Sequence, residues 1–268
     1  MGTHAQIEWL NMLGYTPESW NPLTGCTPIS AGCEHCWAKA MHERFNGTGS
    51  FKPGTVYPHR FQEPLTWRKP RMVAVCLMGD LFHAAVRLGD ILKVFETMWS
   101  PQCRSHIFCI LTKRPALALQ FVELYAGRYL GNPFFRNIWF GVTVENQETC
   151  GRIDTLLQIP AAVRFVSFEP LLGPIILTPE RTKIDWALIG GESGREARSM
   201  GLGWARILID ALKRVKVPIF VKQLGQRPHQ FREPGEGYHA RCLKHPRGAD
   251  PSEWPADLRI REWPKQKG

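Results

Sequence analysis

Short apolar runs alternate with longer segments that have a helical spacing of apolar residues from about residue 72 onward. The runs are rich in β-branched and aromatic residues, a composition that favours buried strands. They lie at residues 72–78, 106–112, 137–145, 163–169, 185–192 and 218–224. Four of the intervening segments have apolar residues three and four positions apart, which predicts helices. These segments lie at residues 91–98, 116–130, 148–157 and 202–215.

Strands that alternate with helices predict a parallel sheet, because a helix is the usual connection between parallel neighbours. The runs are almost continuously apolar, so we expect both faces of the sheet to be covered. A seventh strand is expected within residues 6–20, before Cys26. The sequence therefore predicts an α/β fold, a partial (β/α) barrel of about six to seven parallel strands rather than an open sheet.

Two segments do not follow this alternation. Residues 46–71 contain prolines, glycines and aromatic residues, and we expect them to form a loop-rich insertion within a barrel that spans residues 1–226. Residues 227–268 have no clear periodicity but contain Trp254 and Trp263. We therefore expect an irregular C-terminal extension that packs on the barrel.

The expected location of the protein follows from segments that the sequence lacks. It has no apolar run of about 18 residues or more, the length that a membrane-spanning helix needs. Its first residues, MGTHAQIEWLNMLGY, do not have the basic and apolar regions of a secretory signal. We therefore expect a cytoplasmic protein with no membrane partner.

Polar residues follow each apolar run, where a parallel α/β fold binds its ligands. Because side chains alternate along a strand, residues two apart share a face. This pairs Thr112 with Arg114, Thr143 with Glu145 and Ser167 with Glu169. The resulting candidates for cofactor and substrate binding are Asp80, Arg114, Glu145, Glu169 and Lys222.

Three of the eight cysteines lie close together, in the sequence GCTPISAGCEHCWAKA. Cys26, Cys33 and Cys36 have the spacing C-x6-C-x2-C, and three thiolates this close predict one shared metal centre. A structural zinc ion would need a fourth ligand from His35, His42 or a distant residue. A 4Fe-4S cluster would use the three cysteines and leave one iron open. In contrast, Cys76 and Cys109 lie in apolar runs and are expected to be core residues.

The cysteine segment, together with the barrel pattern, resembles a radical S-adenosylmethionine site. The usual spacing in those proteins is C-x3-C-x2-C with an aromatic residue before the last cysteine, whereas this chain has a longer first gap and His35 at that position. Nearly the whole chain is similar to the phage-associated three-cysteine-motif family of radical-S-adenosylmethionine-like proteins. The matching blocks are IEWLNMLGYTPESWNPLTGC, LMGDLFH, LTKRP, GVTVENQ, RFVSFEPLLGP, IGGESG, FVKQLG and DLRIREWP.

The resemblance implies a 4Fe-4S cluster on the three cysteines, S-adenosylmethionine as the second cofactor, and a small redox protein as electron donor. In that setting Asp80 is a candidate for the cofactor's ammonium group and Glu145 for its ribose hydroxyls. Arg114 and Lys222 are candidates for its carboxylate or for a substrate phosphate, although Arg114 could also be surface charge at the start of a helix. The stretch Gly190–Glu192 resembles the family's ammonium-binding segment but follows a later strand, so a tight turn with a polar end is an equal alternative.

The formal net charge of +10 favours polyanions as partners, nucleic acid first. Arg60, Trp67, Arg68, Lys69 and Arg71 form a basic and aromatic cluster in the 46–71 segment. Such a mixture suits phosphate contact and base stacking, although a short basic run can also be an ordinary solvated surface. A radical formed inside a barrel cannot reach a paired base, so a nucleic-acid substrate would be single-stranded or flipped.

Two functions remain after these observations. The first is a radical S-adenosylmethionine enzyme that generates a 5′-deoxyadenosyl radical and acts on nucleic acid or a nucleotide-like substrate. The second is a non-enzymatic nucleic-acid-binding protein stabilised by zinc or a cluster. Metal content discriminates between them, because iron with sulfide supports the first and zinc alone supports the second.

Overall fold

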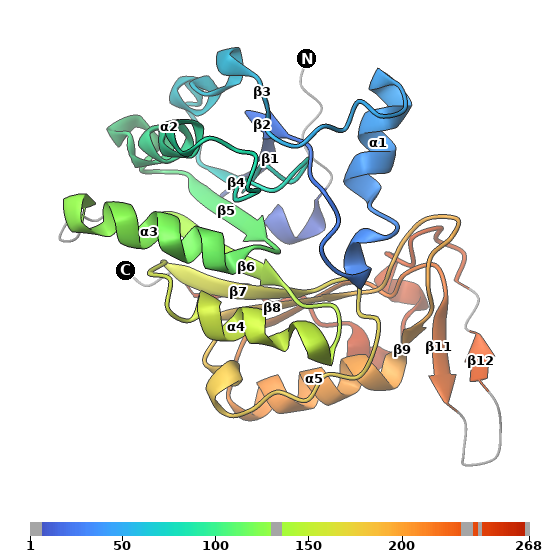
Figure 1. The fold of residues 1–268 in the computed structure, drawn as a ribbon. Coiled ribbons are helices and arrows are strands. Elements are labelled where there is room, and N and C mark those ends of the chain that lie inside the picture. The colour runs from blue at the N-terminus through green and yellow to red at the C-terminus, as the bar shows by residue number, and fades with distance from the viewer. Residues whose placement is uncertain (1–6, 130–135, 232–237, 241–242, 266–268) are drawn as a thin grey trace. The chain divides into compact units, whose positions relative to one another are not determined.

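The computed structural model describes residues 7–129, 136–231, 238–240 and 243–265 (Figure 1). The chain forms two compact units. The first unit contains residues 1–29, 38–142 and 155–164, and the second contains residues 30–37, 143–154 and 165–268. The predicted boundary between a barrel and an extension, at residues 226 and 227, therefore lies inside the second unit.

The first unit is built on parallel strands with helices between them. Its strands are β1 (Thr16–Trp20), β4 (Arg71–Val75), β5 (Ile107–Thr112) and most of β6 (Ile138–Thr143). Its helices are most of α1 (Trp37–Asn46), α2 (Leu88–Trp99) and α3 (Pro115–Tyr129). A short antiparallel pair, β2 (Leu23–Thr24) and β3 (Thr55–Val56), precedes and follows α1. Aromatic rings fill much of the core, where Phe82 contacts Phe95, Phe121 and Phe140.

The second unit repeats the strand and helix alternation. It contains most of β7 (Val163–Phe168), with β8 (Trp186–Gly190) and β10 (Ile219–Gln223). Its helices are most of α4 (Gly151–Leu156) and α5 (Leu202–Arg214). A small second sheet contains β9 (Met200–Gly201), β11 (Pro228–Phe231) and β12 (Tyr238–Ala240). Single turns of 3₁₀ helix, such as η2 (Ala31–Cys33), complete the connections.

The strand order confirms the predicted fold class. The seven strands of the main sheet follow the chain in the order β1-β4-β5-β6-β7-β8-β10. An open doubly wound sheet reverses its order at a switch point, and this sheet has no such reversal. The chain is therefore an α/β protein with the sequential parallel strands of a partial (β/α) barrel. The expected strand before Cys26 is β1, and the other six lie at the predicted apolar runs.

The C-terminal extension, residues 227–268, is part of the second unit, and it is less irregular than predicted. It contains β11 and β12, and β11 pairs with both β12 and β9. Its last described residues run along β10, because Val221 donates its N–H to the Ile260 carbonyl over 2.8 Å. Trp254 is fully buried there. The predicted insertion, 46–71, contains β3 and two 3₁₀ turns, η3 (Pro58–Arg60) and η4 (Glu63–Thr66).

Among the helices that the structure describes, none combines the length and the apolar character that crossing a bilayer requires.

Candidate functional site

The three cysteines of the motif differ from the other described cysteines in their exposure. Cys26, Cys33 and Cys36 are half-buried, whereas the remaining four are buried. Those four are Cys76, Cys103, Cys109 and Cys150. Burial raises the pKa of the Cys76 thiol to about 12 and that of Cys103 to about 11. The buried thiols therefore stay protonated, and the prediction that Cys76 and Cys109 are core residues is confirmed; Cys242 lies outside the described residues.

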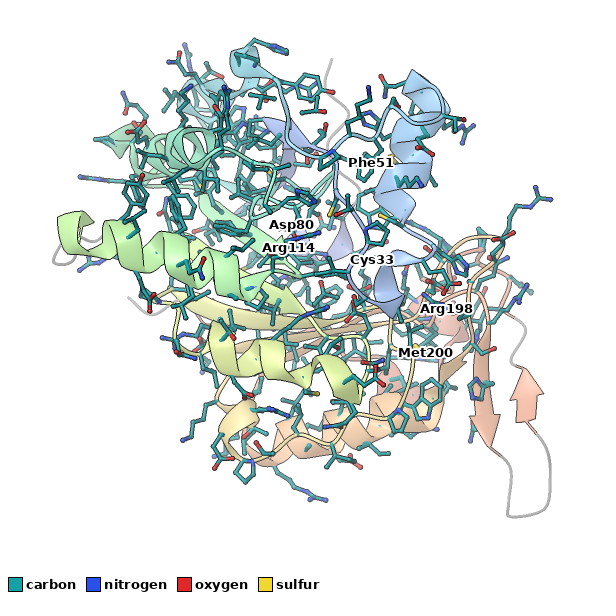
Figure 2. All side chains as sticks on the ribbon, in the orientation of Figure 1. Cys33, Phe51, Asp80, Arg114, Arg198 and Met200 are labelled. Carbon is teal, nitrogen blue, oxygen red and sulfur yellow. The ribbon has the colours of Figure 1, made fainter. Side chains whose placement is uncertain are left out.

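Arg114 joins the start of the cysteine segment to the strand ends of the first unit (Figure 2). Its Nη1 donates to Cys26 Sγ over 3.2 Å and to Asp80 Oδ2 over 3.0 Å. Its Nη2 donates to the Thr27 carbonyl over 2.8 Å. Burial alone would lower the pKa of Arg114, but the negative charges of Asp80 and Cys26 raise it. The guanidinium is therefore a fixed positive charge beside the Cys26 sulfur.

Asp80 holds this arginine in place. Its Oδ1 accepts hydrogen bonds from the Phe82 N–H at 3.0 Å and the Thr112 hydroxyl at 2.7 Å. Its Oδ2 accepts from the Lys113 N–H at 3.2 Å and from Arg114. A carboxylate can accept about four hydrogen bonds, so these four bonds occupy all the acceptor positions of Asp80. The pairing of Thr112 with Arg114, predicted from alternation, is present here, because the Arg114 N–H donates to the Thr112 hydroxyl over 2.9 Å.

Thr27 also contacts a histidine that the sequence did not single out. His83 Nδ1 accepts a hydrogen bond from the Ala85 N–H, so its Nε2 carries the proton and donates to the Thr27 hydroxyl over 2.8 Å. Burial, and then the charge of Arg114, lower the pKa of His83. The imidazole is therefore neutral at pH 7 and fixes Thr27 without adding charge.

In the second unit, Glu145 holds the middle of the cysteine segment. Its side chain is fully buried and accepts from the Ser30 hydroxyl at 2.5 Å and from Arg152 Nη1 at 2.8 Å. Arg152 also donates to the Thr143 carbonyl, so the strand end and the carboxylate share one arginine. Gly32 lies so close that an added Cβ would be 2.3 Å from the Glu145 Cγ. Only glycine permits this approach.

Glu192 and Arg198 hold the later part of the same segment. Arg198 donates to both carboxylate oxygens of Glu192, at 2.7 and 3.0 Å, and also to the Ala31 carbonyl and to Glu34. His35 Nδ1 lies 3.0 Å from the Glu192 carboxylate. Burial alone would raise the pKa of the Glu192 carboxyl, but the hydrogen bonds from Arg198 and His35 lower it to about 2. The Gly190–Glu192 stretch therefore anchors the cysteine segment.

Glu169 and Lys222 form a more accessible ion pair at two strand ends of the second unit. Lys222 Nζ lies 3.1 Å from Glu169 Oε1, and the Ser167 hydroxyl donates to Glu169 Oε2 over 3.1 Å. The predicted pairing of Ser167 with Glu169 is thus present. The two charged side chains are 14% and 25% exposed, so a ligand can reach both.

The basic cluster of residues 60–71 is only partly free for a ligand. Arg60 lies over the Tyr57 ring at 4.4 Å, and Arg71 forms an ion pair with Glu18. Arg68 and Lys69 are exposed. Two of the four cations therefore stabilise the fold, and two face solvent.

Each hydrogen bond of the cysteine segment described above lies within one unit. Cys26 belongs to the first unit, whereas Cys33 and Cys36 belong to the second. Among the described residues, no three His, Cys, Asp or Glu side chains are arranged as a metal-binding group. The sequence did not predict most of the residues that hold this segment. Their roles depend on tertiary contacts, and no distinctive spacing marks Ser30, Arg152 or Arg198.

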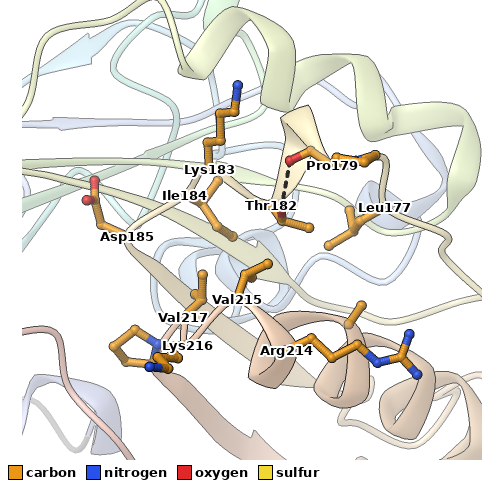
Figure 3. Close-up of a pocket in the computed structure, with 12 residues that line it drawn as sticks. Leu177, Pro179, Thr182, Lys183, Ile184, Asp185, Arg214, Val215, Lys216 and Val217 are labelled. Atoms are coloured by element: carbon orange, nitrogen blue, oxygen red, sulfur yellow. Dashed lines mark hydrogen bonds between the residues drawn. The ribbon is translucent and has the colours of Figure 1, made fainter.

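The second unit also has a cavity of about 710 Å³ at the amino ends of β8 and β10 (Figure 3). Asp185 and Pro218, which precede these strands, contribute to its lining. Ligands of parallel α/β folds bind at the opposite ends of the strands. The cavity is therefore separate from Glu169 and Lys222.

Comparisons with curated proteins and with solved structures found no match to this chain. A family model described as a protein of unknown function, DUF5131, matches residues 4–250. The match spans most of the chain, which therefore belongs to the DUF5131 family.

Proposed function

We propose that the protein is a radical S-adenosylmethionine enzyme that holds a 4Fe-4S cluster through Cys26, Cys33 and Cys36. The observation that carries the proposal is the contrast in exposure, since the three motif cysteines are half-buried and the other described cysteines are buried. Reactive and metal-binding thiolates need such access, whereas buried thiols are inert. Because the three residues lie within a short segment, one centre can bind all of them.

The attachment of the cysteine segment supports the proposal. In the first unit the segment is fixed to the ends of β4 and β5 by Asp80 and Arg114. In the second unit it is fixed by Glu145 and Glu192, which follow β6 and β8. The carboxyl ends of parallel strands are where this class of fold binds its ligands.

The cluster and S-adenosylmethionine would supply a 5′-deoxyadenosyl radical, and the protein would bind, orient and exclude water. Arg114 lies beside Cys26 and favours the thiolate that a cluster requires. Asp80 and Glu145 already have internal partners, so we assign them positioning roles rather than direct contact with the cofactor. Lys222 and Glu169 are partly exposed, and they suit the carboxylate and ammonium groups of an amino acid moiety.

The test is anaerobic reconstitution of the purified chain with iron and sulfide. We expect about four irons per chain, and 5′-deoxyadenosine after addition of a reductant and S-adenosylmethionine. Cys33→Ala should lose the cluster, whereas Cys103→Ala, which changes a buried cysteine, should keep it. Full iron retention in Cys33→Ala would refute the assignment of this ligand. Zinc without iron would support the nucleic-acid-binding alternative.

A further inference from the structure

Helix α1 begins directly after Cys36 and exposes an unusual row of large apolar side chains. Trp37, Met41 and Phe45 are 50%, 49% and 76% exposed. Residues four apart lie on the same face of a helix, so the three side chains form one stripe with about 6 Å between neighbours along the axis. No other described helix has an exposed tryptophan and an exposed phenylalanine.

The neighbouring face of α1 fixes the helix to the first unit. Ala38 and His42 are buried, and the His42 ring contacts the buried Phe51 ring with centroids 5.5 Å apart. Figure 2 shows Phe51, whose ring holds this face of α1 through His42. Because this face supplies the anchoring contacts, the exposed stripe is available for a partner.

The charges beside the stripe define the partner. Arg44 is exposed, and its guanidinium lies 5.9 Å from the Phe45 ring centroid. Lys39 is also exposed, but it lies two positions from Trp37 and Met41 and therefore on the other side of the helix. The helix has one acidic residue, Glu43, and its carboxylate accepts a hydrogen bond from the Gly49 N–H. The first unit contains 15 of the 34 basic residues and 8 of the 24 acidic residues, which gives it +7 of the net charge of +10. The partner should therefore be an anion that also offers flat apolar surfaces.

We infer that the exposed face of α1 binds single-stranded nucleic acid. Trp37 and Phe45 would stack on unpaired bases, and Arg44 would contact a phosphate between them. A paired duplex hides its base faces, so it cannot use the aromatic residues. The inference rests on the proposed function and adds a substrate class to it, because a base stacked on Trp37 is held one residue from Cys36.

The first experiment measures the affinity of the full chain for fluorescently labelled single-stranded DNA and RNA. Trp37→Ala with Phe45→Ala should weaken binding roughly ten-fold or more, because each base stack contributes substantially to affinity. Trp37→Phe should retain most of the affinity, since it keeps an aromatic ring. Leu124→Ala and Ile207→Ala remove exposed apolar side chains from α3 and α5 and serve as matched controls that should not change binding.

The second experiment measures the salt dependence of the same binding. Arg44→Gln should reduce the slope of log affinity against log salt by about 0.7, the value for one lost phosphate contact on a single strand. Lys213→Gln, an exposed cation on α5, should leave the slope unchanged. Wild-type affinity in the Trp37→Ala, Phe45→Ala variant would overturn the inference.

Two further measurements separate this inference from its alternatives. Light scattering of wild type and variant would reveal a contact between copies of the chain, and a change in mass without a change in nucleic-acid affinity would overturn the inference. Iron is assayed in the same samples. Strand binding without iron would support the surface and contradict the enzyme, whereas a loaded cluster without strand binding would contradict the surface alone.

Discussion

Gly32 lets the cysteine segment approach a carboxylate that cannot move away. An added Cβ would lie 2.3 Å from the Glu145 Cγ, and Glu145 is buried between Ser30 and Arg152. Gly32→Ala should therefore lower the free energy of unfolding by about 1–3 kcal/mol, the usual cost of overpacking. Urea denaturation measures this loss.

The matched control is Gly203→Ala in α5, where an added Cβ meets no atom within 4 Å. Gly203 is the second residue of α5, and alanine has a higher helix propensity than glycine, so this variant should be neutral or more stable by up to about 1 kcal/mol. Equal stability of the Gly32→Ala and Gly203→Ala variants would contradict the role assigned to Gly32.

Glu192 makes the free energy of unfolding depend on pH, because its pKa is lowered in the folded protein. The folded-state pKa of about 2 lies below the ordinary value of 4.5, so the stabilisation is complete above pH 4.5 and is lost as the pH falls towards 2. At pH 7 the contribution is on the order of 3 kcal/mol. Glu192→Gln should therefore lower the free energy of unfolding at pH 7 and differ little from wild type near pH 2.

The control for this prediction is Glu34→Gln. Glu34 meets the same arginine but its side chain is 64% exposed, and exposed ion pairs contribute about 0–1 kcal/mol. Urea denaturation of the three proteins between pH 7 and pH 3 is the measurement. A Glu192→Gln deficit that does not shrink as the pH falls would refute the electrostatic origin of the effect.

At the level of single residues, the sequence predicted which side chains share a strand face better than it predicted their hydrogen-bond partners. Strand alternation correctly paired Thr112 with Arg114, because side chains two apart share a face whatever surrounds them. The same reasoning could not show that Asp80 and Glu145 would have their oxygens occupied internally. Arg198 lies six residues after Glu192 in a loop, and no local periodicity marks it as an anchor.

The strands of the main sheet were predictable because each is a buried run with strong β propensity. The six predicted runs correspond to β4, β5, β6, β7, β8 and β10. The small strands β9, β11 and β12 were not predicted. They have two to four residues, too few for a periodicity, and their pairing depends on contacts between distant segments.

The C-terminal segment protects β10 from solvent. Glu262 donates its N–H to the Ile219 carbonyl over 2.9 Å, and its own carbonyl accepts from the Trp186 indole over 2.8 Å. A chain that ends at Arg259 loses these bonds and the one from Val221 to Ile260. Each is worth about 1 kcal/mol, so we expect a loss of roughly 3 kcal/mol or more.

A chain that ends at Lys265 is the control, because it keeps every one of these bonds. The midpoint of thermal unfolding and the turbidity on heating are the measurements, since an uncovered edge strand promotes association. Equal midpoints for the two chains would show that the segment does not stabilise β10.

At the scale of the whole molecule, the division into two units could not be predicted from the sequence. The chain passes between the units several times, at points inside the cysteine segment, α1, β6, α4 and β7. No linker composition marks these crossings. The net charge, in contrast, was predictable, and its uneven distribution places most of it in the first unit.

That distribution leads to a last prediction, about the basic cluster of residues 60–71. Arg60 and Arg71 have partners within the fold, so only Arg68 and Lys69 are expected to contact a polyanion. If they do, Arg68→Gln with Lys69→Gln should reduce the salt slope of single-strand binding by about 1.4. Arg60→Ala with Arg71→Ala should instead lower thermal stability, because it removes two cation–π contacts and an ion pair.

The measurement compares binding to single strands and to duplex over a range of salt concentrations. Counterion release makes the affinity for both forms fall steeply as the salt concentration rises. Because a substrate base must be unpaired, single strands should bind more tightly than duplex. An unchanged affinity and slope in the Arg68→Gln, Lys69→Gln variant would mean that these residues are only a solvated surface. The phosphate contacts would then have to come from other cations of the first unit, with Arg44 on α1 the first to test.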